Sequence, residues 1–196
     1  ERIAAARGLG REELADRLVP TCGLEEGGTR TFSFGSRSFT FVLGAGLEPM
    51  VRSAEGKLAT ELPKPGAKDD AAAAKAAVED WKLLKKQVAE VAKAQTARLE
   101  LAMVLGRRWT PDDLESLFLD HPLMKLLARR LIWSAHDASG DRLFVFRIGD
   151  DDSFSNGKDE ACELGPEVAS VGLLHPAEID ETERRALRSL LADYDI

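Results

Sequence analysis

The sequence that decides the fold is residues 70–105, DAAAAKAAVEDWKLLKKQVAEVAKAQTARLELAMVL, which contain neither glycine nor proline. Asp69 and Asp70 precede a run of alanines, where a carboxylate can cap a helix and interact favourably with its positive end. Gly106 follows directly and is a typical stop signal. The stretch therefore predicts one uninterrupted helix of about 50 Å, at a rise of 1.5 Å per residue.

One face of this helix carries a mainly apolar stripe with 4-3 spacing, which favours packing against other elements. Gln95 and Arg98 interrupt the stripe, and three interpretations are open. The buried face can drift with the 3.6-residue period onto Leu99, Ala102 and Met103, which leaves Gln95 and Arg98 partly exposed or bonded to strand backbone. The two residues can instead form a polar site for an anionic ligand, or contact another helix or domain. The stripe comprises Ala77, Trp81, Leu84, Val88, Val91, Gln95, Arg98, Ala102 and Leu105.

Residues 30–62 have the pattern of a β-meander. Gly35-Ser36 lies between two alternating segments and favours a two-residue type II′ hairpin. That register sets Phe32 opposite Phe39, and it gives Phe32, Phe34, Phe39 and Phe41 one shared face. Pro49 indicates that the third strand lies at an edge or carries a bulge.

After the long helix, residues 111–129 are predicted to form short helices. Thr110-Pro111 and His121-Pro122 are their start signals. Residues 131–174 are predicted to hold strands at 131–134, 142–148 and 168–174, with an acidic loop at 150–166. A capping pattern at Asp180–Glu183 begins a last helix over 180–194.

The strands cluster along the chain and do not alternate with helices, which favours an α+β fold. We expect two groups of antiparallel strands packed around one long helix, with shorter helices beside them. Residues 1–20 are interpreted as the end of an upstream helical region, with helices at 1–7 and 11–18. Residues 21–196 are interpreted as a single α+β domain.

Composition restricts the functions to be considered. The net charge is −7, and such a surface repels nucleic acid unless basic groups cluster. No apolar run has the length of a membrane-spanning helix, so we expect no membrane partner. Cys22 and Cys162 allow one disulfide or two free thiols, and with the three histidines they lack zinc-ligand spacing. No cofactor, metal or catalytic motif is recognised.

Polar residues near the end of the long helix form the candidate ligand-binding site, without a catalytic residue among them. Arg98, Arg107 and Trp109 supply cations and a stacking surface for an anionic small ligand or a peptide carboxylate. An alternative is an enzyme-like site around Arg98, Arg107 and His121. His121 and His175 both precede proline, and they can instead lie at helix starts, bonded to the backbone. The full candidate set is Gln95, Arg98, Glu100, Arg107, Trp109 and His121.

A series of short motifs resembles the bacterial MolR-like domain, which is often found beside a WGR domain. The resemblance implies a C-terminal domain of a large, multidomain cytoplasmic protein with a regulatory role, and it supplies no catalytic residue. Trp109 and Trp133 lack the following Gly-Arg of a WGR motif. The motifs are Leu62–Pro65 with Asp69-Asp70, Trp81 with Leu84–Lys86, Gln95 with Arg98–Glu100, Ala102-Met103, Arg107 with Trp109, His121-Pro122, Leu131–Trp133, His175-Pro176 and Asp193-Tyr194.

The sequence therefore favours a non-enzymatic interaction or ligand-sensing module of a larger protein. Its partners are expected to be other domains of the same chain, a protein partner or an anionic small ligand. An enzyme-like domain and a nucleic-acid-linked regulator are the alternatives.

Overall fold

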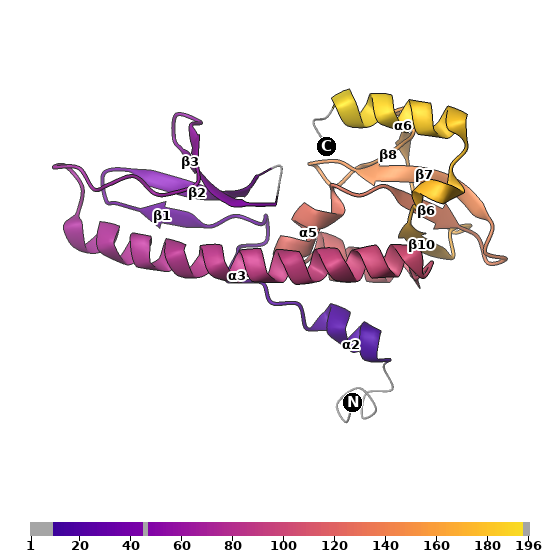
Figure 1. Ribbon diagram of the computed structural model, residues 1–196, viewed down its shortest axis with the longest axis horizontal. Helices are drawn as coiled ribbons and strands as arrows, with labels where there is room; N and C mark the ends of the chain where they lie inside the picture. The colour runs from indigo at the N-terminus through magenta and orange to yellow at the C-terminus, as the bar shows by residue number, and fades with distance from the viewer. Residues whose placement is uncertain (1–9, 45–46, 194–196) are drawn as a thin grey trace.

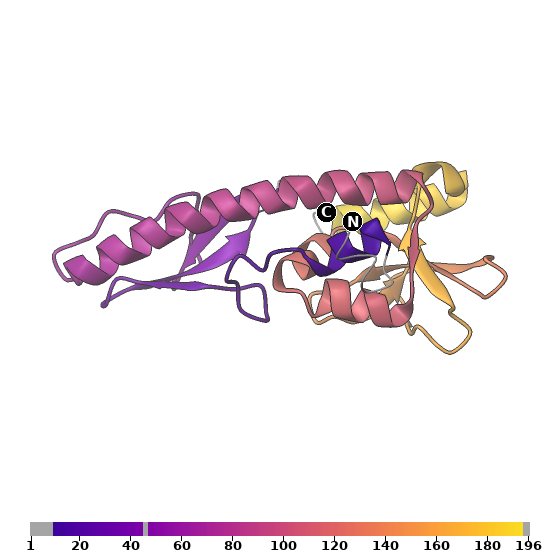
Figure 2. The ribbon, with the colours of Figure 1, turned by 90° about the horizontal axis from the view of Figure 1, so that it is seen from below.

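The fold is organised along helix α3 (Ala71–Val104), which spans two separate antiparallel sheets (Figures 1 and 2). The structure is a computed structural model that describes residues 10–44 and 47–193. The helix predicted at residues 1–7 lies outside the described residues. Helices, two antiparallel sheets and the long helix between them confirm the predicted α+β class.

Both ends of α3 have the predicted signals. The Asp70 side chain accepts a hydrogen bond of 2.8 Å from the Ala73 amide, which makes it the N-cap. At the other end Gly106 has a φ of +62°, and its amide bonds to Met103 O. The Arg107 amide bonds to Ala102 O over 2.8 Å. This pair of bonds is a Schellman motif, which ends the helix and turns the chain back.

The first half of α3 packs against a four-stranded sheet in the order β1-β2-β3-β4. Phe32 lies opposite Phe39, and the Phe34 amide bonds to Arg37 O, as the hairpin prediction requires. The four phenylalanines share one core with Trp81, which confirms their common face. The strands are β1 (Thr31–Ser33), β2 (Ser38–Leu43), β3 (Pro49–Ser53) and β4 (Leu58–Ala59).

Two details of the meander differ from the prediction. Strand β3 lies inside the sheet, and its register with β2 is continuous, so neither the predicted edge nor a bulge is found at Pro49. Proline is tolerated because it is the first residue of β3, and β4 pairs only with Val51 and Arg52 farther along. The fourth strand has only two residues, so the meander ends before residue 62, and the chain then leaves the sheet towards Pro63 and Pro65.

The second half of α3 packs against a six-stranded sheet in the order β5-β10-β6-β7-β8-β9. The predicted acidic loop at 150–166 is wrong in part, because it contains the β8–β9 hairpin. Phe154 pairs with Cys162 there. Both pack against the core between this sheet and the second half of α3, which we call the second core. The two-residue strand β5 was not predicted. The strands are β5 (Arg108–Trp109), β6 (Trp133–His136), β7 (Arg142–Ile148), β8 (Phe154–Asn156), β9 (Ala161–Cys162) and β10 (Ser170–Leu173).

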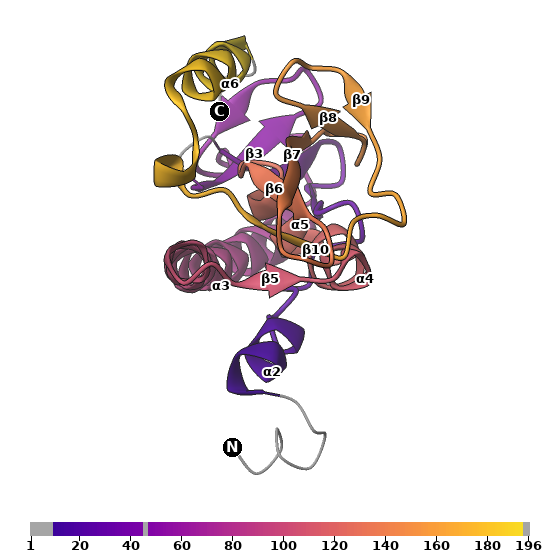
Figure 3. The ribbon, with the colours of Figure 1, turned by 90° about the vertical axis from the view of Figure 1, so that its right-hand side faces the viewer.

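Shorter helices cover the second sheet. Helix α6 lies on one side of it, with Leu187 against Leu174, and α3 and α4 lie on the other side, with α2 beyond them (Figure 3). The Thr110 side chain caps α4, as predicted. Residue 194, the predicted end of the last helix, lies outside the described residues. The helices are α2 (Arg11–Arg17), α4 (Pro111–Leu114), a π-helical turn (Glu115–Leu119), α5 (Pro122–Ala128), a 3-10 turn (Pro176–Glu178) and α6 (Glu181–Asp193).

The buried face of α3 drifts along the helix, as the first interpretation of the stripe predicts. Leu99 and Ala102 are buried in the second core, whereas Leu105, at the end of the predicted stripe, is 71% exposed. Gln95 is buried and Arg98 is half-buried. The partial exposure predicted for Gln95 is therefore wrong, and that predicted for Arg98 is found. Arg98 bonds to helix α2 and not to strand backbone, which is the helix contact of the third interpretation.

Candidate functional site

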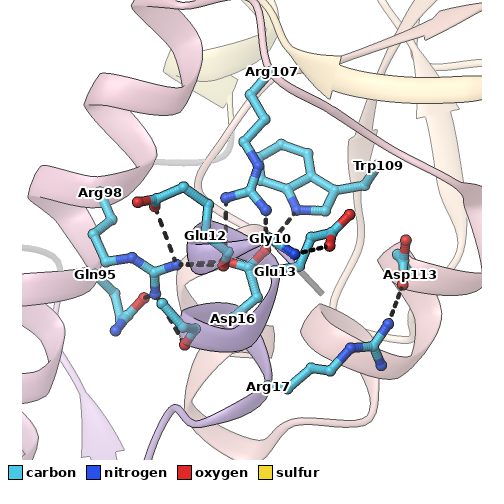
Figure 4. A network of polar contacts seen from close by, with 11 residues as sticks. Gly10, Glu12, Glu13, Asp16, Arg17, Gln95, Arg98, Arg107, Trp109 and Asp113 are labelled. Carbon is cyan, nitrogen blue, oxygen red and sulfur yellow. Dashed lines mark hydrogen bonds and ion pairs between the residues drawn. The ribbon is translucent and has the colours of Figure 1, made fainter. Parts of the chain in front are cut away.

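Four of the predicted residues converge on one carboxylate that sequence reasoning missed. Gln95 and Arg98 project from α3, while Arg107 and Trp109 come from the segment that follows the Schellman turn (Figure 4). Arg98, Arg107 and Trp109 bond directly to Asp16 of helix α2, and Gln95 bonds to Arg98. We call Asp16, Gln95, Arg98, Arg107 and Trp109 the Asp16 cluster.

Asp16 accepts hydrogen bonds from three side chains. Arg98 donates to its Oδ1 over 2.6 Å, and Arg107 donates to its Oδ2. The Trp109 indole Nε1 also donates to Oδ2, over 3.1 Å. Each carboxylate oxygen therefore receives a charge-assisted bond, which is stronger than a bond between neutral groups.

Further contacts hold the two guanidinium groups in place. Arg98 donates to Gln95 Oε1 over 2.7 Å and to the Ala15 carbonyl over 3.3 Å. The Arg107 guanidinium carbon lies 5.0 Å from the centre of the Trp109 ring, within the range of a cation–π contact. The two polar residues that interrupt the apolar stripe therefore act together, because Gln95 orients Arg98 towards α2.

Local structure explains the position of each donor. Gln95 and Arg98 are three residues apart and so lie on the same side of α3. The left-handed turn at Gly106 brings Arg107 back towards that side. Trp109 pairs with Val171 of β10, which fixes it at the edge of the sheet.

The Asp16 cluster is partly shielded from water. The side chains of Asp16, Arg98 and Arg107 are 11%, 25% and 21% exposed. Two guanidinium groups face this one carboxylate, and the Glu12 carboxylate lies 4.0 Å from Arg98 but is 61% exposed. The cluster is suited to hold a carboxylate, and it contains no nucleophile or general base aimed at a cavity.

Glu100 and His121 are not part of the cluster. Glu100 is exposed and lines a separate cavity. His121 Nδ1 accepts bonds from the Leu123 and Met124 amides, and its Nε2 lies 3.0 Å from Val19 O. His121 therefore caps α5, and His175 caps the 3-10 turn in the same way, which confirms the backbone-bonded interpretation of both histidines.

The other side chains that could act as a base or a nucleophile, His136 and the two cysteines, are at least partly buried. His136 is buried on β6, with Ser134 Oγ at 2.9 Å and Gly140 O at 3.3 Å. Burial lowers the pKa of His136, with the nearby Arg108 as the next cause. Cys22 and Cys162 are free thiols, and burial raises the pKa of each, so neither is activated as a nucleophile.

Residues 10–44 and 47–193 contain no group of three or more His, Cys, Asp or Glu side chains that could hold a metal ion. Within the same ranges, none of the helices combines the length and apolar character needed to cross a membrane.

The fold and the cluster together define an α+β domain in which two arginines and a tryptophan bond to the carboxylate of Asp16. The chain belongs to the family described as Domain of unknown function (DUF4132), which matches residues 56–196. Arg98, Arg107 and Trp109 lie within the matched segment, and Asp16 lies outside it.

One relative extends over almost the whole chain. It is Uncharacterized protein YehI of Escherichia coli (strain K12), which is 39% identical over 196 residues. The similarity covers 99% of this chain but only 16% of YehI, so the chain spans a small part of that protein's length. No solved structure matches the chain significantly.

Proposed function

We propose that the chain is a non-enzymatic interaction domain with a regulatory role in a larger protein. Arg98, Arg107 and Trp109 form a receptor for a carboxylate, and Asp16 of the same chain occupies that receptor. A carboxylate from another domain, from a protein partner or from an anionic small ligand would compete with Asp16. Exchange of these carboxylates would move helix α2.

The way α2 is held supports this proposal. Helix α2 has no buried residue, so little apolar surface anchors it. Its two other ion pairs are exposed: Arg17 and Asp113, 3.1 Å apart, have side chains that are 45% and 31% exposed, and the Glu12 side chain, 4.0 Å from Arg98, is 61% exposed. Exposed pairs contribute about 0–1 kcal/mol. The Asp16 contacts, together with the Arg98 bonds to the Glu12 and Ala15 carbonyls, therefore carry most of the polar attachment of α2, and replacing the Asp16 carboxylate would weaken this attachment.

A domain that covers 16% of a relative is expected to act together with the remaining chain. The resemblance to MolR-like, WGR-associated proteins supports a regulatory role, a C-terminal position and a bacterial cytoplasmic location. The enzyme-like alternative around Arg98, Arg107 and His121 has no supporting observation, since both His121 ring nitrogens are engaged at the start of α5.

The test uses the full chain with Asp16→Asn, which keeps the shape of residue 16 and removes its charge. A peptide of residues 10–20 that retains Asp16 should bind the variant and shift the indole N–H resonance of Trp109. The same peptide with asparagine at position 16 should not. Wild-type protein should bind the acidic peptide more weakly, because its receptor is occupied.

Asp113→Asn is the matched control, because it removes the ion pair that Arg17 of α2 makes and leaves the receptor occupied by Asp16. This control should behave like wild type towards the peptide. Equal binding of the two peptides to the Asp16→Asn variant, or no binding of either, would refute the receptor.

A further inference from the structure

One edge of strand β1 is paired with no strand among the described residues. The strand is the first in the order β1-β2-β3-β4, so it pairs with β2 on one side only. The backbone of Phe34 and that of Arg30 bond to the neighbouring segment that contains β2. Hydrogen-bonded pairs alternate along an antiparallel ladder, so Phe32 is the bonded residue between them. Thr31 and Ser33 therefore direct their N–H and C=O groups away from β2, and both residues are exposed.

A groove of about 240 Å³ lies between this edge and the first half of α3, where β1 runs beside the helix (Figure 1). We call it the β1 groove. Its strand side is β1, and its helix side is formed by Ala73, Ala76, Ala77 and Asp80. Three of these four helix side chains are single methyl groups, so a further chain can approach the edge of β1 without meeting a large side chain of α3.

Contacts at both ends of the β1 groove hold α3 beside β1. At one end the Asp70 amide, at the start of α3, bonds to Phe34 O over 2.8 Å. At the other end Arg30 donates to the two carboxylate oxygens of Asp80 over 2.6 and 2.5 Å. The two walls of the groove are therefore fixed relative to each other, and the edge at Thr31–Ser33 lies open between these contacts.

The chemistry of this edge matches an extended peptide. Thr31 and Ser33 each offer one N–H and one C=O, which is the pattern that an added antiparallel strand satisfies. Paired residues lie on the same face of a sheet, so the side chain opposite Phe32 would point towards α3 and enter the groove. The alanine wall leaves room there for an aliphatic side chain, and a β-branched one such as valine suits a strand.

Charge beside the β1 groove favours a basic group in the added strand. The Asp70 carboxylate is exposed at the end of the groove where Phe34 lies, and it accepts a bond from the uncharged Ala73 amide. A lysine opposite Phe34 would lie on the helix side of the sheet, near Asp70. The net charge of −7 attracts a basic segment over longer distances as well.

We propose that the β1 groove binds an extended segment of the larger protein that contains this chain. The segment adds an antiparallel strand to β1, with a β-branched aliphatic residue opposite Phe32 and a basic residue near Asp70. The similarity to YehI covers only 16% of that protein, so the remaining chain is long enough to supply such a segment. This occupant rests on the larger protein of the proposed function, whereas the groove shares no residue with the Asp16 cluster.

Three capped peptides test this chemistry on the full wild-type chain. Ac-Lys-Thr-Val-Thr-Lys-NH2 has the expected pattern, a second peptide has aspartate in place of valine, and a third has N-methylated threonines that cannot donate to β1. The first should shift the Thr31 and Ser33 amides and the Ala76 methyl, and it should bind at least about tenfold more tightly than the others. The Val171 methyls, in the second core, should not shift. Equal binding of the three peptides, or no shift of the two amides at millimolar peptide, would overturn the proposal.

Ala76→Leu tests the groove from the helix side, because the larger side chain occupies the space for the valine. It should weaken binding of the first peptide by about tenfold or more. Ala72→Leu is the matched control, since Ala72 is an exposed alanine of α3 that does not line the groove. It should change the affinity by less than about twofold. Leucine is a good helix former, so both variants keep α3. A similar affinity in the two variants would contradict the groove as the binding site.

Hydrogen exchange in the larger protein tests the occupant. The Thr31 and Ser33 amides should exchange at least about tenfold more slowly there than in the isolated chain, because the added strand accepts their bonds. Ala76→Leu in the larger protein should remove this protection, and Ala72→Leu should not. Equal exchange in the larger protein and the isolated chain would refute the occupant. Asp16→Asn should leave binding of the first peptide unchanged, so that failure of this proposal and failure of the carboxylate receptor are distinguishable.

Discussion

Asp16→Asn should weaken the attachment of α2 far more than it weakens the rest of the fold. The side chain of Asp16 is 11% exposed, and those of its two arginine partners are 25% and 21% exposed. Removing one member of an exposed ion pair costs about 0–1 kcal/mol, and of a buried pair about 3–5 kcal/mol. The Asp16 contacts lie between these limits, and asparagine keeps one acceptor oxygen, so we expect a loss of about 2–3 kcal/mol.

Hydrogen exchange of the α2 amides measures this loss directly. At about 1.36 kcal/mol for each factor of ten, protection of residues 14–17 should fall by about 30- to 150-fold. If α2 is held by less than this energy, protection should fall to that of an unstructured chain. Amides in β2 and β6 should keep their protection, because local opening of α2 does not require the cores to open.

The matched variant Asp113→Asn removes a pair whose side chains are 31% and 45% exposed. Its effect on α2 protection should be below about fivefold, in keeping with an exposed pair. Unchanged α2 protection in Asp16→Asn would refute the reasoning. Equal loss in the two variants would also refute it, because α2 would then not depend on the Asp16 cluster in particular.

Three further predictions concern stability measured by urea unfolding. Gly28→Ala should destabilise the fold by more than Gly106→Ala, for which we expect about 1 kcal/mol. Both glycines have positive φ, but a Cβ at Gly28 would lie 2.7 Å from Pro122 O, whereas none of the described atoms lies within 4 Å at Gly106. Asp70→Ala should cost about 1 kcal/mol by removing the N-cap of α3. Burial lowers the pKa of His136 below its usual value near 6.5, so its contribution should be complete above that pH and decrease as the pH falls towards the folded-state pKa.

Separate outcomes would contradict each of these predictions. Equal losses for the two glycine variants would show that the contact with Pro122 relaxes easily. An unchanged stability in Asp70→Ala, with Asp70→Asn as the conservative control, would show that α3 does not depend on this cap. For His136, the difference in stability between pH 7.5 and 5.5 should become smaller in His136→Gln. An unchanged difference would assign the pH dependence to other groups.

Local signals in the sequence were sufficient for most of the helices and for the first hairpin. The long helix, its cap at Asp70 and its end at Gly106 follow from residues within a few positions of each other. The register of Phe32 with Phe39 follows from the two-residue turn between their strands. Short strands were missed: β5 and β9 have only two residues each, too few for a periodic pattern, and β5 exists through pairing with the distant strand β10.

The donors of the candidate site were predictable from the sequence, but the carboxylate to which they bond was not. The polar break at Gln95 and Arg98, and the proximity of Arg107 and Trp109 to the end of the helix, are visible in the sequence. Asp16 was not predictable as their partner, since it lies 82 residues from Arg98 and 91 from Arg107. It resembles any other acidic residue of a short helix.

The sequence by itself determined most of the helices, their caps, the first hairpin and the donors available for an anion, because these depend on neighbouring residues. Only the tertiary structure decided that Asp16 meets those donors and that His121 and Glu100 do not. It also decided that the unpaired edge of β1 borders a groove lined by alanines of α3. The physical reason is that hydrogen bonds, ion pairs and cavities depend on distances in space, which sequence separation does not encode.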